Sequence, residues 1–280
     1  MVTLIDALNN IIANPANQIN KVSKSGIRIN IVGDSLEDYI KNAFAGTFVQ
    51  GPQNLLIHQQ TFSWQGNQNN PPDLIIKGYD AIEVKKIEGT GSIALNSSYP
   101  HDKLTSSSTM ITADCCACES SSYWEKEVLY VVGTVVDNFI KYLFFVYGDV
   151  YAASSDIYER VRVKIKEGIL DIPDVEFAET NELGKVKKVD PLGITDLRIR
   201  GMWSIQHPFQ VFSYIDQVKV PKTEGYHIFV LLSKAKFETF DRQQVETLIK
   251  QNSVQKFEVK IKNPNNPVNL IDGVLIKIRL

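Results

Sequence analysis

The sequence predicts a mixed α/β fold in which a central mixed β-sheet is flanked by helices. Segments with helical spacing of apolar residues stand on either side of short β-branched and aromatic runs that have the length of strands. The chain has 280 residues, of which 44% are hydrophobic and 22% charged, so it can bury a large core. We expect one domain, residues 1–280, in which additional elements follow the central sheet and its helices toward the C-terminus.

Four segments are predicted to be helices, and the first three of them have the spacing of apolar residues that is typical of amphipathic helices. The first, residues 2–13, ends before Pro15, which cannot continue a helix. The second, residues 34–44, begins with Asp34 as a plausible N-cap, and Glu37 follows at the spacing of a capping box. The two later helices are expected at residues 154–168 and 242–251.

Strands are predicted where β-branched and aromatic residues gather between turn residues. The longest two, residues 127–136 and 142–151, are separated by a turn at Asp137-Asn138. Two short segments surround a turn at Gly78-Tyr79. Further strands are expected at residues 55–64, 226–233, 258–261 and 274–278, and loops at residues 63–72 and 170–216.

The segment of residues 71–86 carries the most informative polar side chains. Because side chains along a strand alternate between faces, Glu83 and Lys85 share one face and their apolar neighbours pack on the other. Asp73 stands just before the first of the two short strands, where a hairpin can bring it beside Glu83. Two carboxylates and a lysine at one place can bind a divalent cation and activate a water, which is the chemistry of phosphodiester cleavage.

Pro72-Asp73 and Glu83-Val84-Lys85 together resemble the PD-(D/E)xK signature of a large nuclease superfamily. Other stretches resemble the NgoPII-type type II restriction endonucleases, and the resemblance extends from the first helix to the C-terminus. The stretches that carry it are residues 66–73, 83–89, 94–100, 177–180, 189–195, 200–203 and 263–267.

The resemblance implies a restriction-endonuclease-like core at about residues 30–170, with DNA-recognition loops and C-terminal elements at about residues 170–280. It implies Mg²⁺-dependent cleavage of both strands of DNA at the palindrome GGCC, leaving 5′-phosphate and 3′-hydroxyl ends, with Mn²⁺ able to replace Mg²⁺. One active site per chain and a palindromic site imply a homodimer. A companion methyltransferase would act on the same site without a stable complex.

Asp73 and Glu83 are the predicted metal ligands, since Mg²⁺ is held by one or two carboxylates, waters and phosphate oxygens. Lys85 is predicted to orient or deprotonate the attacking water and to neutralise charge at the phosphorus. Lys86 points to the opposite face unless a bulge exchanges the two lysines. For Glu37 two interpretations stay open: it completes its capping box, or it approaches the metal, as an acid on this helix does in related nucleases.

Sequence recognition is expected from residues outside the metal site. Arg198 and Arg200 flank Ile199, so both can face one groove, and arginine is the usual bidentate reader of guanine. The alternative is that they hold phosphates or form surface ion pairs. The other predicted DNA contacts follow the catalytic strand or the two arginines: Asn96, Ser97, Ser98, Lys103, Trp203 and Gln206.

Composition restricts the other classes of function. A net charge of −2 argues against a protein that coats nucleic acid, although a basic cleft can be balanced elsewhere. No apolar run approaches the roughly 20 residues that span a bilayer, and no signal peptide is evident, so a cytoplasmic protein with no membrane contact is expected. Cys115, Cys116 and Cys118 lack zinc-site spacing and are expected to be free thiols.

Two other functions remain compatible with the sequence. A repair or structure-specific nuclease of the same superfamily would share the metal chemistry but read DNA shape. A non-catalytic DNA-binding protein would carry the carboxylates by accident.

Overall fold

The computed structural model describes residues 1–280 except residues 20–35, 50, 68–69, 109–110 and 181. A nine-stranded sheet forms the centre, in the order β1-β2-β3-β6-β7-β12-β14-β13, with β5 paired to β6. The pairs β3-β6 and β7-β12 are parallel and the other pairs of this sheet are antiparallel, which confirms a mixed sheet. Its strands are β1 Phe62–Asn67, β2 Asn70–Ile76, β3 Ala81–Ile87, β5 Lys103–Thr105, β6 Glu125–Val136, β7 Phe139–Tyr147, β12 His227–Ser233, β13 Val254–Lys262 and β14 Leu270–Arg279.

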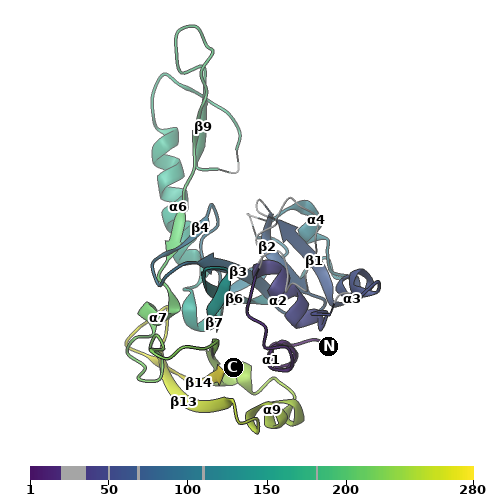
Figure 1. The fold of residues 1–280 in the computed structure, drawn as a ribbon. Helices are drawn as coiled ribbons and strands as arrows, with labels where there is room; N and C mark the ends of the chain where they lie inside the picture. Colours follow the sequence, from purple (N-terminus) through teal and green to yellow (C-terminus); the bar gives the residue numbers. More distant parts are fainter. Residues whose placement is uncertain (20–35, 50, 68–69, 109–110, 181) are drawn as a thin grey trace.

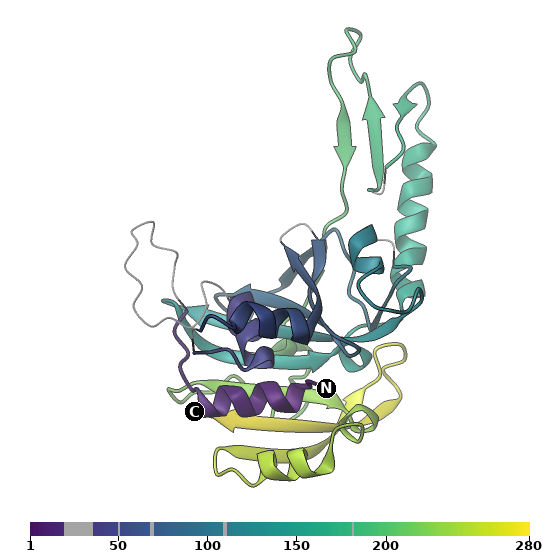
Figure 2. The same cartoon turned by 90° about the vertical axis from the view of Figure 1, so that its right-hand side faces the viewer.

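Apolar side chains pack against both faces of this sheet and form two cores. One core contains residues from the helices α1, α2 and α9, and α1 lies along the C-terminal strands in Figure 2. The other core contains residues from the short helices α5 and α7 and from strand β4 (Ile93–Asn96). The helices are α1 Leu4–Ala13, α2 Leu36–Ala45, α3 Asn54–Thr61, α4 Ala113–Cys116, α5 Gly148–Tyr151, α6 Ser155–Leu170, α7 Pro208–Val211, α8 Lys234–Phe237 and α9 Arg242–Ile249.

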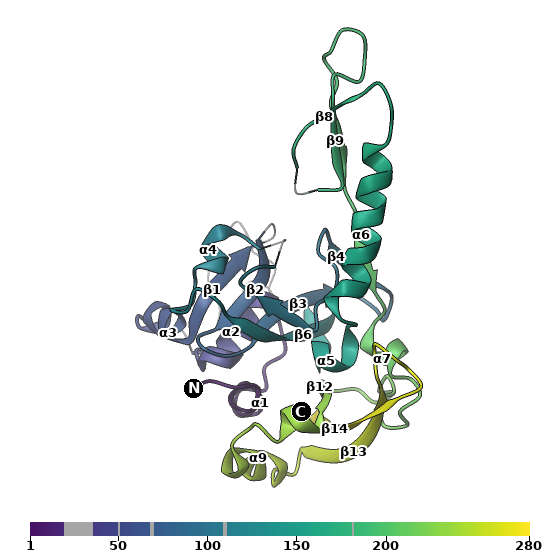
Figure 3. The ribbon, with the colours of Figure 1, turned by 180° about the vertical axis from the view of Figure 1, so that it is seen from behind.

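An arm, which we define as residues 155–200, projects from the rest of the molecule (Figures 1–3). It consists of α6 and a separate antiparallel sheet of β8 (Glu176–Phe177), β9 (Gly184–Lys187) and β10 (Leu197–Ile199). None of the residues of α6, all of which the structure describes, is buried. The chain returns to the body through β11 (Trp203–Ile205), which pairs with β4 (Ile93–Asn96).

The sequence patterns predicted most long elements correctly. The four predicted helices are present as α1, α2, α6 and α9, and the turn between β6 and β7 lies at Asp137 and Asn138. Both turn residues have positive φ, 52° and 66°, as a tight hairpin turn of type I′ requires. The predicted N-cap at Asp34 lies outside the described residues. The cysteines are free thiols, as expected.

The segment before the hairpin of β2 and β3 was predicted wrongly. Residues 55–61 belong to helix α3 rather than to a strand, and its leucines, Leu55 and Leu56, are exposed. The supposed loop at residues 63–72 instead lies mostly in β1 and β2, where Gln65 pairs with Leu74 and Asn67 with Asn70. Backbone hydrogen bonds hold these strands together, and such bonds do not require apolar side chains. The side chains of this segment are mostly polar, so the sequence shows no alternation of apolar and polar residues that would predict a strand.

Two further predictions need correction. Residues 148–151 turn into the short helix α5 instead of continuing β7. Gly148 approaches the backbone of His101 and Asp102 so closely that a Cβ there would lie 2.4 Å from the His101 carbonyl oxygen. The long loop expected at residues 170–216 contains the strands β8 to β11 and the helix α7. In the described part of the chain, no helix is both long and apolar enough to cross a membrane.

A buried ion cluster joins the C-terminal elements to the hairpin of β2 and β3. The ammonium group of Lys236, on α8, binds Asp80 at 2.9 Å and also Glu127. The hydroxyl group of Tyr147 donates to Asp80 at 2.7 Å. Burial raises the pKa of Asp80, whereas Lys236 and Tyr147 act against this rise. Asp80 directly precedes β3, so this cluster fixes the start of that strand.

We predict that Lys236→Met lowers the free energy of unfolding by about 3–5 kcal/mol, because it leaves a buried carboxylate without its cation. Urea unfolding monitored by circular dichroism would measure the change. The control is Lys234→Met in the same short helix, where the side chain is exposed and a change of about 0.5 kcal/mol or less is expected. Equal losses in the two variants would contradict a stabilising role of the cluster.

Candidate active site

The hairpin of β2 and β3 brings Asp73 next to β3. Leu74 pairs with Ile82 and Ile75 with Ala81 across the hairpin. The backbone N–H of Val84 donates to Oδ2 of Asp73 at 2.6 Å, which fixes the carboxylate against β3. Asp73 therefore lies within β2, which begins at Asn70, and not before the strand as the sequence suggested.

Glu83 and Lys85 share one face of β3, as predicted. Nζ of Lys85 donates to Oε1 of Glu83 at 2.5 Å, and both side chains are mostly buried. The register between β3 and β6 is continuous, so no bulge exchanges Lys85 with Lys86. Lys86 is exposed.

Burial and the neighbouring negative charges dominate the electrostatics of the site. Burial raises the pKa of Asp73 to about 7, and the charge of Glu83 adds to this rise, while Lys85 and the N–H of Val84 oppose it. Burial lowers the pKa of Lys85, but the charges of Glu83 and Asp73 and the hydrogen bond to Glu83 outweigh this effect and raise it. Lys85 is therefore a cation at neutral pH, and among the described residues it is the cation that acts on both carboxylates.

The donor set fits a divalent cation of the magnesium type. Such an ion takes oxygen ligands, uses one or two carboxylates and keeps several waters. No group of three or more His, Cys, Asp or Glu side chains within the described ranges is arranged to hold a metal by itself. Asp73 and Glu83 would thus supply two carboxylates, and waters and a phosphate would complete the ligand shell. A cation there would offset the burial and the repulsion by Glu83, which together raise the pKa of Asp73.

Glu37 lies in the first turn of α2, which packs against β3. Its side chain is exposed, yet its charge contributes to the raised pKa of Asp73 and of Lys85, as the smallest of the contributions named for each. Glu37 is therefore close enough to act on the site through its charge. The capping interpretation involves Asp34, which lies outside the described residues.

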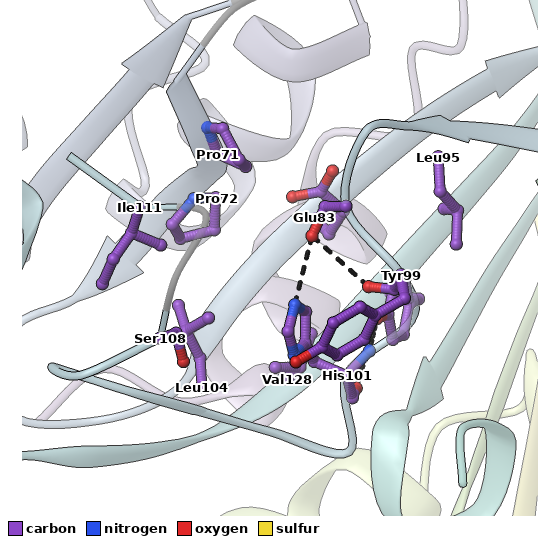
Figure 4. Close-up of a pocket in the computed structure, with 12 residues that line it drawn as sticks. Pro71, Pro72, Glu83, Leu95, Tyr99, His101, Leu104, Ser108, Ile111 and Val128 are labelled. Carbon is purple, nitrogen blue, oxygen red and sulfur yellow. Dashed lines mark hydrogen bonds between the residues drawn. The ribbon is translucent and has the colours of Figure 1, made fainter. Parts of the chain in front are cut away.

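A small pocket with a cavity volume of about 30 Å³ lies beside Glu83 (Figure 4). Pro72 and Glu83 line it together with Tyr99 and His101. The imidazole of His101 lies 3.1 Å from Oγ of Ser98, and burial lowers its pKa to about 4, so the ring is neutral at physiological pH. His101 was not predicted at this site, because a single histidine in a loop has no spacing pattern.

The predicted DNA contacts lie in several different environments. Ser97 and Ser98 follow β4, and Ser98 lines the pocket beside Glu83. Asn96, whose side chain is outside the description, pairs through its backbone with Trp203. The Trp203 ring packs edge-on against Tyr99 at 5.9 Å, so part of its surface is used inside the protein.

The remaining predicted contacts are more exposed. Lys103, on β5, pairs with Glu125 at 2.6 Å. Gln206 is exposed, and its backbone carbonyl accepts a hydrogen bond from Tyr151. Arg198 and Arg200 lie together on the arm and not beside the hairpin.

Comparisons with known proteins support the conclusion that this chain is a nuclease. The NgoPII restriction endonuclease family matches residues 2–263. The chain is 41% identical over 282 residues to the type II restriction enzyme NgoPII of Neisseria gonorrhoeae, and the alignment covers 99% of each chain. No solved structure matches the chain significantly. The chain is thus a type II restriction endonuclease, a site-specific deoxyribonuclease. Within that class, it belongs to the NgoPII restriction endonuclease family.

We predict that Asp73→Asn stabilises the metal-free protein at pH 8 by about 1–2 kcal/mol. The pKa of Asp73 in the folded protein, about 7, lies above its ordinary value of 3.8. The unfolded chain therefore loses this proton first, and the carboxylate costs stability as the pH rises from about 4 to about 7. Above this window the cost remains, and the neutral amide avoids it.

Urea unfolding at several pH values between 5 and 8 would test this prediction. The advantage of Asp73→Asn should shrink as the pH falls. Asp114→Asn, an exposed replacement of the same kind, is the control and should show a small effect at each pH. An advantage that does not depend on pH would contradict the assigned cause.

Proposed function

We propose that Asp73, Glu83 and Lys85 form the catalytic site of a Mg²⁺-dependent endonuclease that cleaves duplex DNA at GGCC. The observation that carries this proposal is the hairpin geometry, in which Val84 binds Asp73 and Lys85 binds Glu83. When bound, Mg²⁺ supplies a Lewis acid for the phosphate and lowers the pKa of a bound water. Mn²⁺ can replace it, because it also accepts carboxylate and water ligands.

The side chains of the site have separate tasks in this proposal. Asp73 and Glu83 bind the cation, and the N–H of Val84 keeps Asp73 in the orientation that this requires. Lys85 keeps its ammonium group next to Glu83, where it orients the attacking water and stabilises the negative charge that develops on the phosphate. Water attacks the phosphorus in line, leaving a 5′-phosphate and a 3′-hydroxyl. Glu37 acts on the site through its charge.

The assembly follows from the substrate. A palindrome offers two equivalent phosphodiester bonds, and each chain carries one hairpin site, so we propose a homodimer that cuts one strand with each subunit. A companion methyltransferase protects the host DNA at the same sequence without a stable complex with the nuclease. Both would act in the cytoplasm, where the host DNA lies.

We predict that the purified protein cuts plasmid DNA only at GGCC with Mg²⁺ and does not cut it with a chelator. Mapping the ends of the fragments would measure this. Cuts at another fixed palindrome would keep the enzyme class and contradict GGCC. Nicks or a smear would favour the repair or structure-specific nuclease, and no cutting in either condition would contradict the proposal.

We predict that Glu83→Gln lowers the cleavage rate at least about 10²–10³-fold, because it removes a charged ligand from the metal. The variant should still bind the same duplex in Ca²⁺. Glu88→Gln is the control, since this exposed side chain lies just after β3. A normal rate for Glu83→Gln would contradict the assigned site.

We further predict that two chains of Glu83→Gln bind one duplex containing the cleavage site. Sedimentation velocity on the complex in Ca²⁺ would give its mass. A complex of one chain with one duplex would contradict the homodimer.

A further inference from the structure

In the arm, two arginine side chains bind the carboxylate group of one glutamate. Nε and Nη2 of Arg198 donate to Oε2 and Oε1 of Glu182 at 3.0 and 2.9 Å. Nε of Arg200 lies 2.5 Å from the same Oε1. The arginine side chains are 58% and 56% exposed, whereas Glu182 is only 18% exposed. The carboxylate is thus the inner member of the group, and the two guanidinium groups face the solvent.

The backbone places the two arginines on one face. Arg198 lies in β10, and its partner across the small sheet is Lys185. Arg200 follows two residues later, so in an extended chain its side chain points the same way.

The contacts with Glu182 leave one edge of each guanidinium group available. A guanidinium group has five N–H donors in a planar fork. Glu182 uses the edge that contains Nε, and Nη1 of either arginine makes no hydrogen bond to the described part of the chain. The open edge consists of Nη1 and the second N–H of Nη2, which points away from Nε. This edge has the geometry that binds O6 and N7 of guanine in a bidentate manner.

We propose that Glu182 is a positioning residue that holds Arg198 and Arg200 as a rigid pair for reading the guanines of one half-site. This inference rests on the proposed function, in which each half of the palindrome contains guanine. Holding the side chains in place before binding reduces the entropy lost when they contact a base. The carboxylate also lowers the charge of the group from +2 to +1, so the pair attracts phosphates of any sequence less strongly.

Two other roles for Glu182 fit the geometry less well. A carboxylate that blocks the arginines until DNA displaces it would cover their outer edge, but Glu182 binds the inner edge. A phosphate clamp would place a carboxylate next to a phosphate, where the two repel each other. The arrangement therefore favours contact with bases over contact with the DNA backbone.

The test compares Glu182→Gln with Glu176→Gln. Glu176 lies on the same arm, is exposed and pairs with Lys188 at 3.6 Å, so its replacement makes the same change of charge without touching the arginines. Binding would be measured by fluorescence anisotropy in Ca²⁺, with the duplex that the unaltered protein cleaves and with duplexes in which one guanine of each half-site is replaced. Cleavage rates in Mg²⁺ would be measured on the same duplexes.

For Glu182→Gln we expect the ratio of affinities between the cleaved and the altered duplexes to fall about 10-fold or more, as the loss of one bidentate contact would produce. Glu176→Gln should keep this ratio within about twofold. Circular dichroism and the melting temperature should be equal in the two variants. Cleavage of the altered duplexes should rise relative to the cleaved site in Glu182→Gln only.

Two outcomes would overturn the role of Glu182. One is an unchanged ratio in Glu182→Gln, and the other is tighter binding of the cleaved duplex with an unchanged or higher ratio, which would identify Glu182 as a block. The discrimination of the unaltered protein is measured first. Its absence would contradict the proposed function itself, whereas normal discrimination in both variants would contradict only the positioning role.

Discussion

The burial of the Asp73 carboxylate beside Glu83 is the constraint on which the geometry of the site depends. The two groups are held on neighbouring strands and share one lysine, so burial and Glu83 together raise the pKa of Asp73 to about 7. A loose hairpin would let the two carboxylates move apart. The N–H of Val84 prevents this, because it fixes Asp73 to the strand that carries Glu83. The charged form of Asp73 therefore costs stability, and in the proposed function a bound cation would offset this cost.

The frame that tolerates this cost includes the C-terminal third of the chain. β12 pairs in parallel with β7 and continues the central sheet, while β14 and β13 extend it to its edge. Lys236, just after β12, reaches Asp80 at the start of β3. The C-terminal strands β12, β13 and β14, which the sequence suggested as additional elements, are thus part of the central sheet. Through Lys236 this part of the chain anchors the strand that carries Glu83.

The sequence was informative where local rules decide the structure and uninformative where distant contacts do. Alternation along β3 predicted that Glu83 and Lys85 share a face, and the Asp137-Asn138 pair predicted the tight turn. Helix α3 was missed because its leucines are exposed and give no one-sided pattern. The link between Arg198 and Glu182 joins residues 16 positions apart through a turn of the arm, and no spacing rule reveals such a pair.

The absence of buried residues in α6, all of which is described, has a consequence for how such an enzyme can change. Side chains in a tightly packed core constrain one another, so a replacement there is felt by its neighbours. An arm that contributes little to that packing is released from this constraint. Its surface can be altered by substitution, insertion or exchange with another arm while the sheet and its hairpin stay intact. A library confined to residues 155–200 is accordingly a natural starting material for directed evolution of new target sequences.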